Sequence, residues 1–297
     1  MISIAIPVYN YDISHLLDVL EKQISKENFS VEIIIIDDCS TNEIIKASNK
    51  IRAKQHLYAE NDINYGRVAT RLALATKAHY DWILFMDADV IPLKSDFISS
   101  FSKEIRLNYD LIFGGIMYTE KLDHPEHSLR WSYGKKSEAK SYIERKNLPY
   151  SSIISQHFCI RKSIAVSIFS EMDINAYGMD ILFTYLFEKH KVNVLHMDNP
   201  TIHLGLEKNE EYLEKTIKGL ETTYQLERQG LIPINYRPVQ QKSLLLNKLY
   251  LSRLFLSAFS VFIKSIEDNL KTVKPNLTLF GLYKLYHYIK IKRAKYS

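Results

Sequence analysis

The run Trp82-Ile83-Leu84-Phe85-Met86 is followed at once by Asp87-Ala88-Asp89. Five consecutive apolar residues that end in polar turn residues are typical of a strand buried on both faces, as in a parallel sheet covered by helices. Open parallel sheets bind ligands beyond the carboxyl ends of their strands. The segment therefore predicts an α/β fold with Asp87 and Asp89 at the ligand-binding edge.

The chain before this run repeats an alternation of strand and helix. Strands are predicted at 2–8, 31–36 and 57–58, and helices at 13–24, 43–53 and 67–78. Such alternation is typical of βαβ units. We expect a mostly parallel, Rossmann-like sheet flanked by helices.

The pattern is looser after residue 90. A strand with a glycine break is predicted at 111–118, an irregular polar stretch at 119–152, strands at 158–160 and 193–197, and helices at 163–169, 180–190 and 207–229. A long irregular stretch in a compact domain is often a binding loop. Prolines near 233–238 suggest a boundary, so we expect an α/β domain over 1–235 and a helical C-terminal region over 236–297.

Composition narrows the class of protein. The 297 residues are 46% hydrophobic and 25% charged, as in an ordinary globular protein. Two cysteines, Cys39 and Cys159, provide neither a disulfide framework nor metal-ligand spacing, which suits a reducing compartment. The start resembles a strand more than a signal peptide, and no run of 18 apolar residues predicts a spanning helix. We therefore expect a cytoplasmic location.

Charge is distributed unevenly. From residue 241 to 297 there are 11 lysines and arginines but two acids, whereas 1–240 holds 28 basic and 32 acidic residues. In this basic end, apolar residues over 244–263 are interrupted by Lys248, Arg253 and Lys264, as in an amphipathic helix. Contact with an anionic membrane at the inner face of the plasma membrane is one interpretation. Helices packed on the rest of the chain or on a second copy are the alternative, which leaves a homo-oligomer open.

Three side chains near the predicted sheet edge suit a phosphate-bearing ligand. The carboxylates of Asp87 and Asp89 are hard oxygen ligands for Mg²⁺ or Mn²⁺ shared with phosphates, or else a solvated acidic turn. Arg71, on the alanine-rich helix, is either a counter-charge to a diphosphate or a surface arginine.

Three further residues each have a functional and a structural interpretation. Asp38, after the second strand, can hold a base or ribose, or can cap the next helix. Asp180 opens a helix and can be a general base or a cap. His203 can bind a metal or be an ordinary loop histidine.

The order and spacing of these residues resemble the family 2 glycosyltransferases. The likeness rests on Ile4–Asn10, Ile35–Asn42, Asn64-Tyr65-Gly66 with Arg71, Phe85–Asp89 and Gly178-Met179-Asp180. It covers about residues 1–205. The chain departs from the family pattern at Met179, at Thr70-Arg71-Leu72 and at Val90.

The resemblance implies a GT-A fold and an inverting transfer from a nucleoside-diphosphate sugar with Mn²⁺ or Mg²⁺. It implies that Asp180 is the catalytic base and that Asp89 and His203 lie at the metal. The donor nucleotide would contact Pro7, Tyr9, Asn10, Asp38, Arg71 and Asp87. The expected acceptor is a glycan or a lipid-linked molecule, in surface polysaccharide synthesis.

Trp131 and Tyr133 are candidates for acceptor binding, because aromatic faces pack on sugar C–H surfaces. Arg130 and Arg145 nearby could hold phosphates. Anchoring of the loop by Trp131 is the alternative.

Other functions fit the sequence less well. A sugar nucleotidyltransferase would be expected to have a glycine-rich loop after its first strand, and Pro7-Val8-Tyr9-Asn10 has no glycine. A nucleotide-sugar-binding scaffold without turnover stays an alternative, although Asp87, Asp89 and Asp180 are retained. No dinucleotide G-x-G-x-x-G follows a strand, and the acidic body argues against a nucleic-acid partner.

Overall fold

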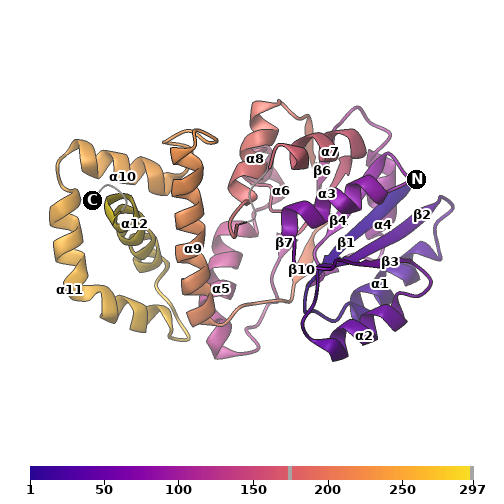
Figure 1. Ribbon diagram of the computed structural model, residues 1–297, viewed down its shortest axis with the longest axis horizontal. Coiled ribbons are helices and arrows are strands. Elements are labelled where there is room, and N and C mark those ends of the chain that lie inside the picture. Colours follow the sequence, from indigo (N-terminus) through magenta and orange to yellow (C-terminus); the bar gives the residue numbers. More distant parts are fainter. Residues whose placement is uncertain (173–175, 295–297) are drawn as a thin grey trace. The chain divides into compact units, whose positions relative to one another are not determined.

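A computed structural model describes residues 1–172 and 176–294. The chain forms two compact units (Figure 1). The first contains 1–119, 137–175 and 183–205, and the second contains 120–136, 176–182 and 206–297, as far as these residues are described. The helix over 209–228 thus has its contacts in the second unit, although we predicted it within the 1–235 domain. Compactness does not show which part folds by itself, so the boundary at 235 stays a prediction.

The first unit is built on a seven-stranded sheet. Its order is β3 (Leu57–Glu60), β2 (Val31–Asp37), β1 (Ile2–Val8), β4 (Trp82–Met86), β8 (His157–Arg161), β6 (Leu111–Phe113) and β9 (Val194–His196). All neighbours are parallel except that β8 runs antiparallel to both β4 and β6. The prediction of a mostly parallel α/β sheet is confirmed.

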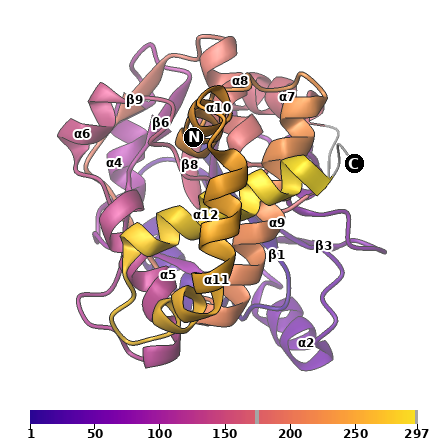
Figure 2. The ribbon, with the colours of Figure 1, turned by 90° about the vertical axis from the view of Figure 1, so that its left-hand side faces the viewer.

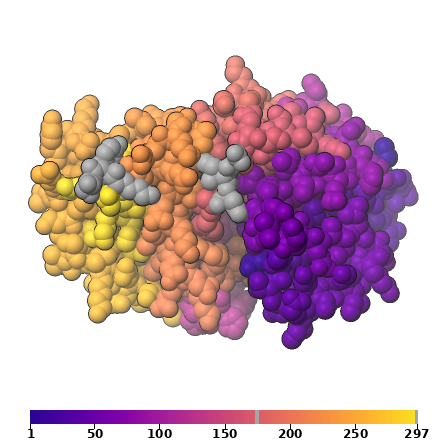
Figure 3. Space-filling view, viewed as in Figure 1, coloured from indigo at the N-terminus to yellow at the C-terminus, as the bar shows by residue number. Residues whose placement is uncertain are grey.

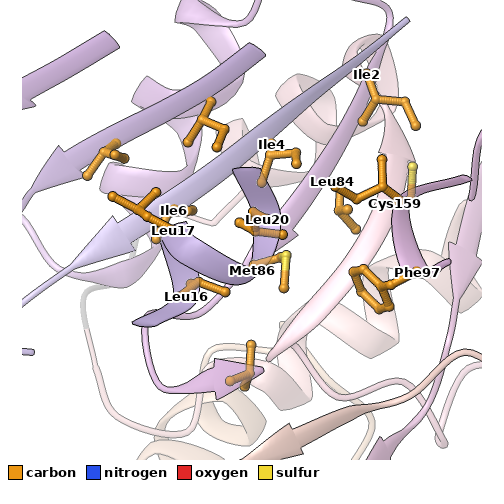
Figure 4. Packing of buried hydrophobic residues seen from close by; sticks show 14 of the residues in the cluster. Ile2, Ile4, Ile6, Leu16, Leu17, Leu20, Leu84, Met86, Phe97 and Cys159 are labelled. Carbon is orange, nitrogen blue, oxygen red and sulfur yellow. The ribbon is translucent and has the colours of Figure 1, made fainter. Parts of the chain in front are cut away.

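Helices flank this sheet. The helices of the first unit are α1 (Ser14–Ile24), α2 (Glu43–Arg52), α3 (Arg67–Lys77), α4 (Phe97–Glu104), α6 (Tyr142–Asn147) and α7 (Lys162–Ser170). Leu16, Leu17 and Leu20 recur on one face of α1 and are buried in the same cluster as Ile4 and Ile6 (Figure 4). This packing fixes the carboxyl ends of β1, β2 and β4 at one edge.

A small second sheet lies in the same unit. Its order is β5 (Val90–Pro92), β10 (Thr201–His203) and β7 (Ile116–Met117). The predicted strand at 111–118 is therefore two strands in two sheets. Gly114 and Gly115 lie between them. Position 115 requires glycine, because φ is +94° there and a Cβ would lie 2.0 Å from Nη1 of Arg145.

The predicted irregular stretch at 119–152 contains short helices. They are η1 (Pro125–His127), α5 (Ser128–Tyr133), the short π-helix η2 (Gly134–Glu138) and α6. A capping box begins α6: Ser141 accepts from the Glu144 N–H, and the Glu144 side chain accepts from the Ser141 N–H. Helices of one or two turns are too short to show an apolar period, so the prediction of irregular structure was wrong here.

The second unit is helical (Figure 2). Besides α5 it contains α9 (Asn209–Arg228), α10 (Pro238–Lys248), α11 (Ser252–Leu270) and α12 (Leu277–Ala294). The helix α8 (Asp180–Lys189) begins in this unit and continues in the first. Leu213 of α9, Leu270 of α11 and Phe280 of α12 share one buried cluster. The predicted amphipathic helix at 244–263 is broken between α10 and α11.

Among the described residues, no single helix is long and apolar enough to cross a membrane. The bent pair of α10 and α11, at 117°, passes that test by length and composition only.

Candidate active site

The loop after β1 is tied to the loop after β2. Asn10 has a left-handed backbone (φ +51°), and its Oδ1 accepts from the N–H groups of Thr41 (2.8 Å) and Asn42 (3.0 Å). Its own N–H donates to Ser40 Oγ at 2.8 Å. Pro7 lies one residue before the end of β1 at Val8, and Tyr9 is 49% exposed beside this junction. The strand ends thus present a braced loop with an exposed aromatic ring.

Asp38 braces a second junction. Its carboxylate accepts from Asn61 Nδ2 at 2.7 Å and from the N–H groups of Tyr65 (3.0 Å) and Gly66 (2.8 Å). The alternative that Asp38 caps the next helix is wrong, because the Asn42 side chain accepts from the Ile45 N–H and caps α2. Asp38 joins the end of β2 to the start of α3, and its contact with a base stays a prediction.

Arg71 and Asp87 form a buried ion pair. Nη2 of Arg71 lies 2.6 Å from Asp87 Oδ1 and donates to the Ser155 carbonyl at 2.6 Å. Arg71 is only 3% exposed, which excludes the surface-arginine alternative. Nη1 of Arg67 lies 3.8 Å from Oδ2 of Asp87. Two cations therefore flank this carboxylate at the end of β4.

Asp89 and His203 lie together where β5 of the small sheet begins and β10 ends. Nε2 of His203 is 3.2 Å from Asp89 Oδ2, because β10 pairs with β5 in a register that sets His203 opposite Val90. The Leu204 N–H donates to the Asp89 carbonyl at 2.9 Å. Burial favours the neutral form of Asp89, but the hydrogen bond and charge interaction with His203, with help from Arg67, outweigh it and lower the pKa of that carboxyl.

Gly205 makes this approach of the chain to Asp89 sterically possible. A Cβ at Gly205 would lie 2.2 Å from Asp89 Oδ2 and 2.8 Å from its Cγ. Gly205 was not among the residues predicted for the site. Its one signal is a glycine two residues after a candidate metal ligand.

The Asp89–His203 pair fits part of a divalent-metal site. No group of three or more His, Cys, Asp or Glu side chains suited to a metal occurs in the described residues. Mg²⁺ is commonly held by one or two carboxylates plus substrate phosphates and water, so a site with few protein ligands suits a metal that arrives with a diphosphate. Asp89 and His203 would hold it.

Asp180 belongs to the second unit. It begins α8, and the preceding turn is held on α9: Gly178 has φ +90°, and a Cβ there would lie 3.0 Å from Gly219 Cα. The Tyr177 ring has Nζ of Lys215 5.9 Å from its centroid. Asp180 therefore directly follows a turn whose backbone is fixed by close contact with a helix.

The predicted acceptor residues lie on α5 and pack within the second unit. Nζ of Lys135 lies 4.5 Å from the Trp131 ring centroid. The Tyr133 ring lies 5.4 Å from the Phe280 ring, next to the helical core. Arg130 is paired with Glu207, with Nε and Oε2 3.4 Å apart. These contacts do not test acceptor binding, which stays a prediction for Trp131 and Tyr133.

Arg145 lies in the first unit and is buried. Its guanidinium donates to the carbonyls of Lys140, Gly114 and Met197. These contacts show a structural role and do not support the phosphate contact that the sequence suggested.

Comparison with known proteins identifies the class. Residues 3–168, more than half of the chain, match the family model described as glycosyl transferase family 2. The chain therefore belongs to this family of glycosyltransferases, and its α/β unit has the GT-A fold. No curated protein matches the chain.

Two solved structures illustrate the likeness in fold. A mannosyltransferase from Pyrobaculum calidifontis, in complex with GDP-Man and Mn²⁺, is 11% identical; the match covers 99% of this chain and 86% of that one, with a TM-score of 0.57. Glucosyl-3-phosphoglycerate synthase from Mycobacterium tuberculosis, in complex with Mn²⁺, UDP and glucosyl-3-phosphoglycerate, is 15% identical, covering 77% and 80%, with a TM-score of 0.52.

Proposed function

We propose that the chain is an inverting, metal-dependent glycosyltransferase that moves a sugar from a nucleoside-diphosphate sugar to a hydroxyl of a glycan or lipid-linked acceptor. Surface polysaccharide synthesis at the inner face of the plasma membrane is the proposed setting. The observation that carries the proposal is the Asp89–His203 pair, 3.2 Å apart, at the ligand-binding edge of a GT-A sheet. Relatives in fold solved with Mn²⁺ and UDP or GDP-Man support this class of donor.

The donor side of the reaction would use residues of the first unit. A bound divalent metal would supply Lewis-acid stabilisation of the charge on the departing diphosphate. Asp89 and His203 would hold it, and the Arg71–Asp87 pair, flanked by Arg67, would keep the end of β4 rigid beside the ribose. Tyr9, Asn10 and Asp38 would line the nucleoside pocket together with Pro7.

The acceptor side would use Asp180. Its carboxylate would take the proton from the acceptor hydroxyl while that oxygen attacks the anomeric carbon. The bond from the anomeric carbon to the diphosphate breaks in the same step, so a single displacement inverts the anomeric centre.

The test is turnover by Asp180→Asn. We expect kcat to fall by ~10²-fold or more with donor binding retained, since the variant keeps its shape but loses the base. Asp123→Asn, an exposed carboxylate of the same unit, is the control and should keep full activity. Full activity of Asp180→Asn would contradict the assignment.

Product analysis separates the alternatives. Release of nucleoside diphosphate with an inverted glycosidic product supports the proposal. Pyrophosphate release would indicate a nucleotidyltransferase, and donor binding without any product would indicate a scaffold.

A further inference from the structure

The end of α10 and the outer side of α11 carry a large exposed apolar surface, which we call the corner surface. Its members are Leu245, Leu249, Tyr250, Leu251, Leu254, Val261 and Phe262, with exposed fractions between 41% and 93%. Residues 254, 258, 261 and 262 fall on one side of α11 by their spacing of three and four, and Leu251 directly precedes the helix. The adjoining side of the helix, with Ile266 and Leu270, packs in the helical core. The apolar face of α11 is therefore wide, and the protein covers only one flank of it.

The corner surface includes an aromatic residue at the bend between the two helices. α10 and α11 meet at 117°, and Tyr250 between them is 93% exposed with a left-handed backbone at φ +60°. This conformation is strained for a bulky side chain, and such strain often marks functional positions. Tyrosine is enriched where one end of a side chain meets an apolar phase and the other meets water.

The same two helices carry exposed positive charge. Lys242, Lys248, Arg253 and Lys264 are all exposed on α10 and α11, and the acids of this segment, Glu267 and Asp268, lie near the far end of α11. Space-filling Figure 3 colours this segment light orange. Helices that combine exposed apolar side chains with lysine and arginine are typical of segments that lie in the headgroup layer of an anionic bilayer.

We propose that the corner surface binds an anionic lipid bilayer, with α10 and α11 lying in the interface. The inference rests on the proposed function in one respect, since a lipid-linked acceptor makes attachment useful. A second copy of the chain is the less favourable occupant of this surface. A two-fold interface would bring the cations of α10 and α11 from both copies together, and like charges that face each other disfavour association. The 117° bend disfavours a straight span.

The test is flotation of the full-length chain with vesicles at about 0.15 M salt. We expect binding to vesicles that contain phosphatidylglycerol and little binding to pure phosphatidylcholine. Leu254→Ser combined with Phe262→Ser should weaken binding by ~10-fold or more, since two apolar side chains that would enter the bilayer are lost. Ile44→Ser combined with Ile51→Ser, at positions on α2 that are at least as exposed, is the matched control and should bind like the wild type. Arg253→Glu with Lys264→Glu should weaken binding and reduce its salt dependence.

Three results would overturn the proposal: no binding to anionic vesicles, unchanged binding by the Leu254/Phe262 variant, or a dimer that this variant dissociates without any vesicle binding. Donor binding measured without vesicles keeps the two proposals apart. If the wild type binds no donor in that measurement, the proposed function is contradicted, whereas the conclusion from the vesicle experiment is unaffected.

Discussion

At the scale of single residues, Gly205 sets how closely the chain after β10 passes the Asp89 carboxylate. Any side chain there would lie within 3 Å of three Asp89 atoms, at 2.2, 2.7 and 2.8 Å. The Asp89–His203 contact at 3.2 Å depends on the same space. A single methyl group would therefore displace the proposed metal ligand without touching the core of the sheet.

Gly205→Ala tests this geometry. We expect affinity for a nucleoside diphosphate in the presence of Mn²⁺ to fall by ~10-fold or more, since the ligand geometry is lost. Gly281→Ala is the control, because a Cβ at this helical glycine meets nothing within 4 Å. Calorimetric titration measures both. Equal affinity of Gly205→Ala and wild type would mean that Asp89 does not hold the metal.

Glu21 shows how one carboxylate joins α1 to α2. Its oxygens lie 2.9 and 2.7 Å from the guanidinium of Arg52, and they also contact Gln55 and His56. The hydrogen bond from Arg52, aided by those from His56 and Gln55, lowers the pKa of Glu21 from 4.5 to about 2. The folded state therefore holds this carboxyl ionised at pH values where the unfolded chain binds a proton.

The pH dependence of stability follows from this shift. Glu21→Gln should lower the free energy of unfolding by about 1–2 kcal/mol at pH 7. The difference from wild type should shrink as pH falls from 4.5 towards 2, because the stabilisation from a lowered pKa is lost on protonation. Asp18→Asn, which removes a 66% exposed partner of Arg52, should cost less than about 0.5 kcal/mol. Urea unfolding between pH 3 and 7 measures these free energies. If the difference between wild type and Glu21→Gln stayed constant with pH, the lowered pKa of Glu21 would be contradicted.

At the scale of elements, the turn before α8 is the point at which local structure controls the proposed base. Gly178 requires a left-handed backbone and approaches Gly219 of α9 closely, so neither its conformation nor its contact allows a side chain. By contrast, a Cβ at Gly219 would lie 3.8 Å from the Tyr177 ring, an ordinary contact.

Gly178→Ala should therefore lower kcat while the donor KM changes little, because the turn that carries Asp180 must move. Gly219→Ala is the matched control on the other side of the same contact, and its kcat should stay near that of wild type. Steady-state kinetics measures kcat and the donor KM separately. A wild-type kcat for Gly178→Ala would show that this turn does not position the base.

The elements differ in how well the sequence predicts them. The strand at 82–86 is a continuous apolar run between polar residues, and the structure matches it to the residue. The direction of β8 was not predictable, since a strand's own sequence does not encode whether its neighbours run parallel. The break between α10 and α11 was missed because apolar residues continue across it, and only the backbone at Tyr250 reveals it.

At the scale of the whole molecule, the candidate residues divide between two compact units. Asp87, Asp89 and His203 belong to the first and Asp180 to the second. The sequence could name these residues because their spacing resembles the family pattern. It could not predict that Arg71 is buried against Asp87 or that Gly205 borders Asp89, since both contacts join segments distant in the chain.

The most direct test of the central claim is the thermal stability of the wild type with a panel of nucleoside diphosphates and nucleotide sugars, with and without Mn²⁺. We expect one base series to raise Tm, and Mn²⁺ to increase that rise, since ligands that bind the folded state stabilise it. Asp89→Ala should lose the metal-dependent part, while Asp81→Ala, at the opposite end of β4, should keep it. No rise with any nucleotide, or an unchanged rise in Asp89→Ala, would contradict the account.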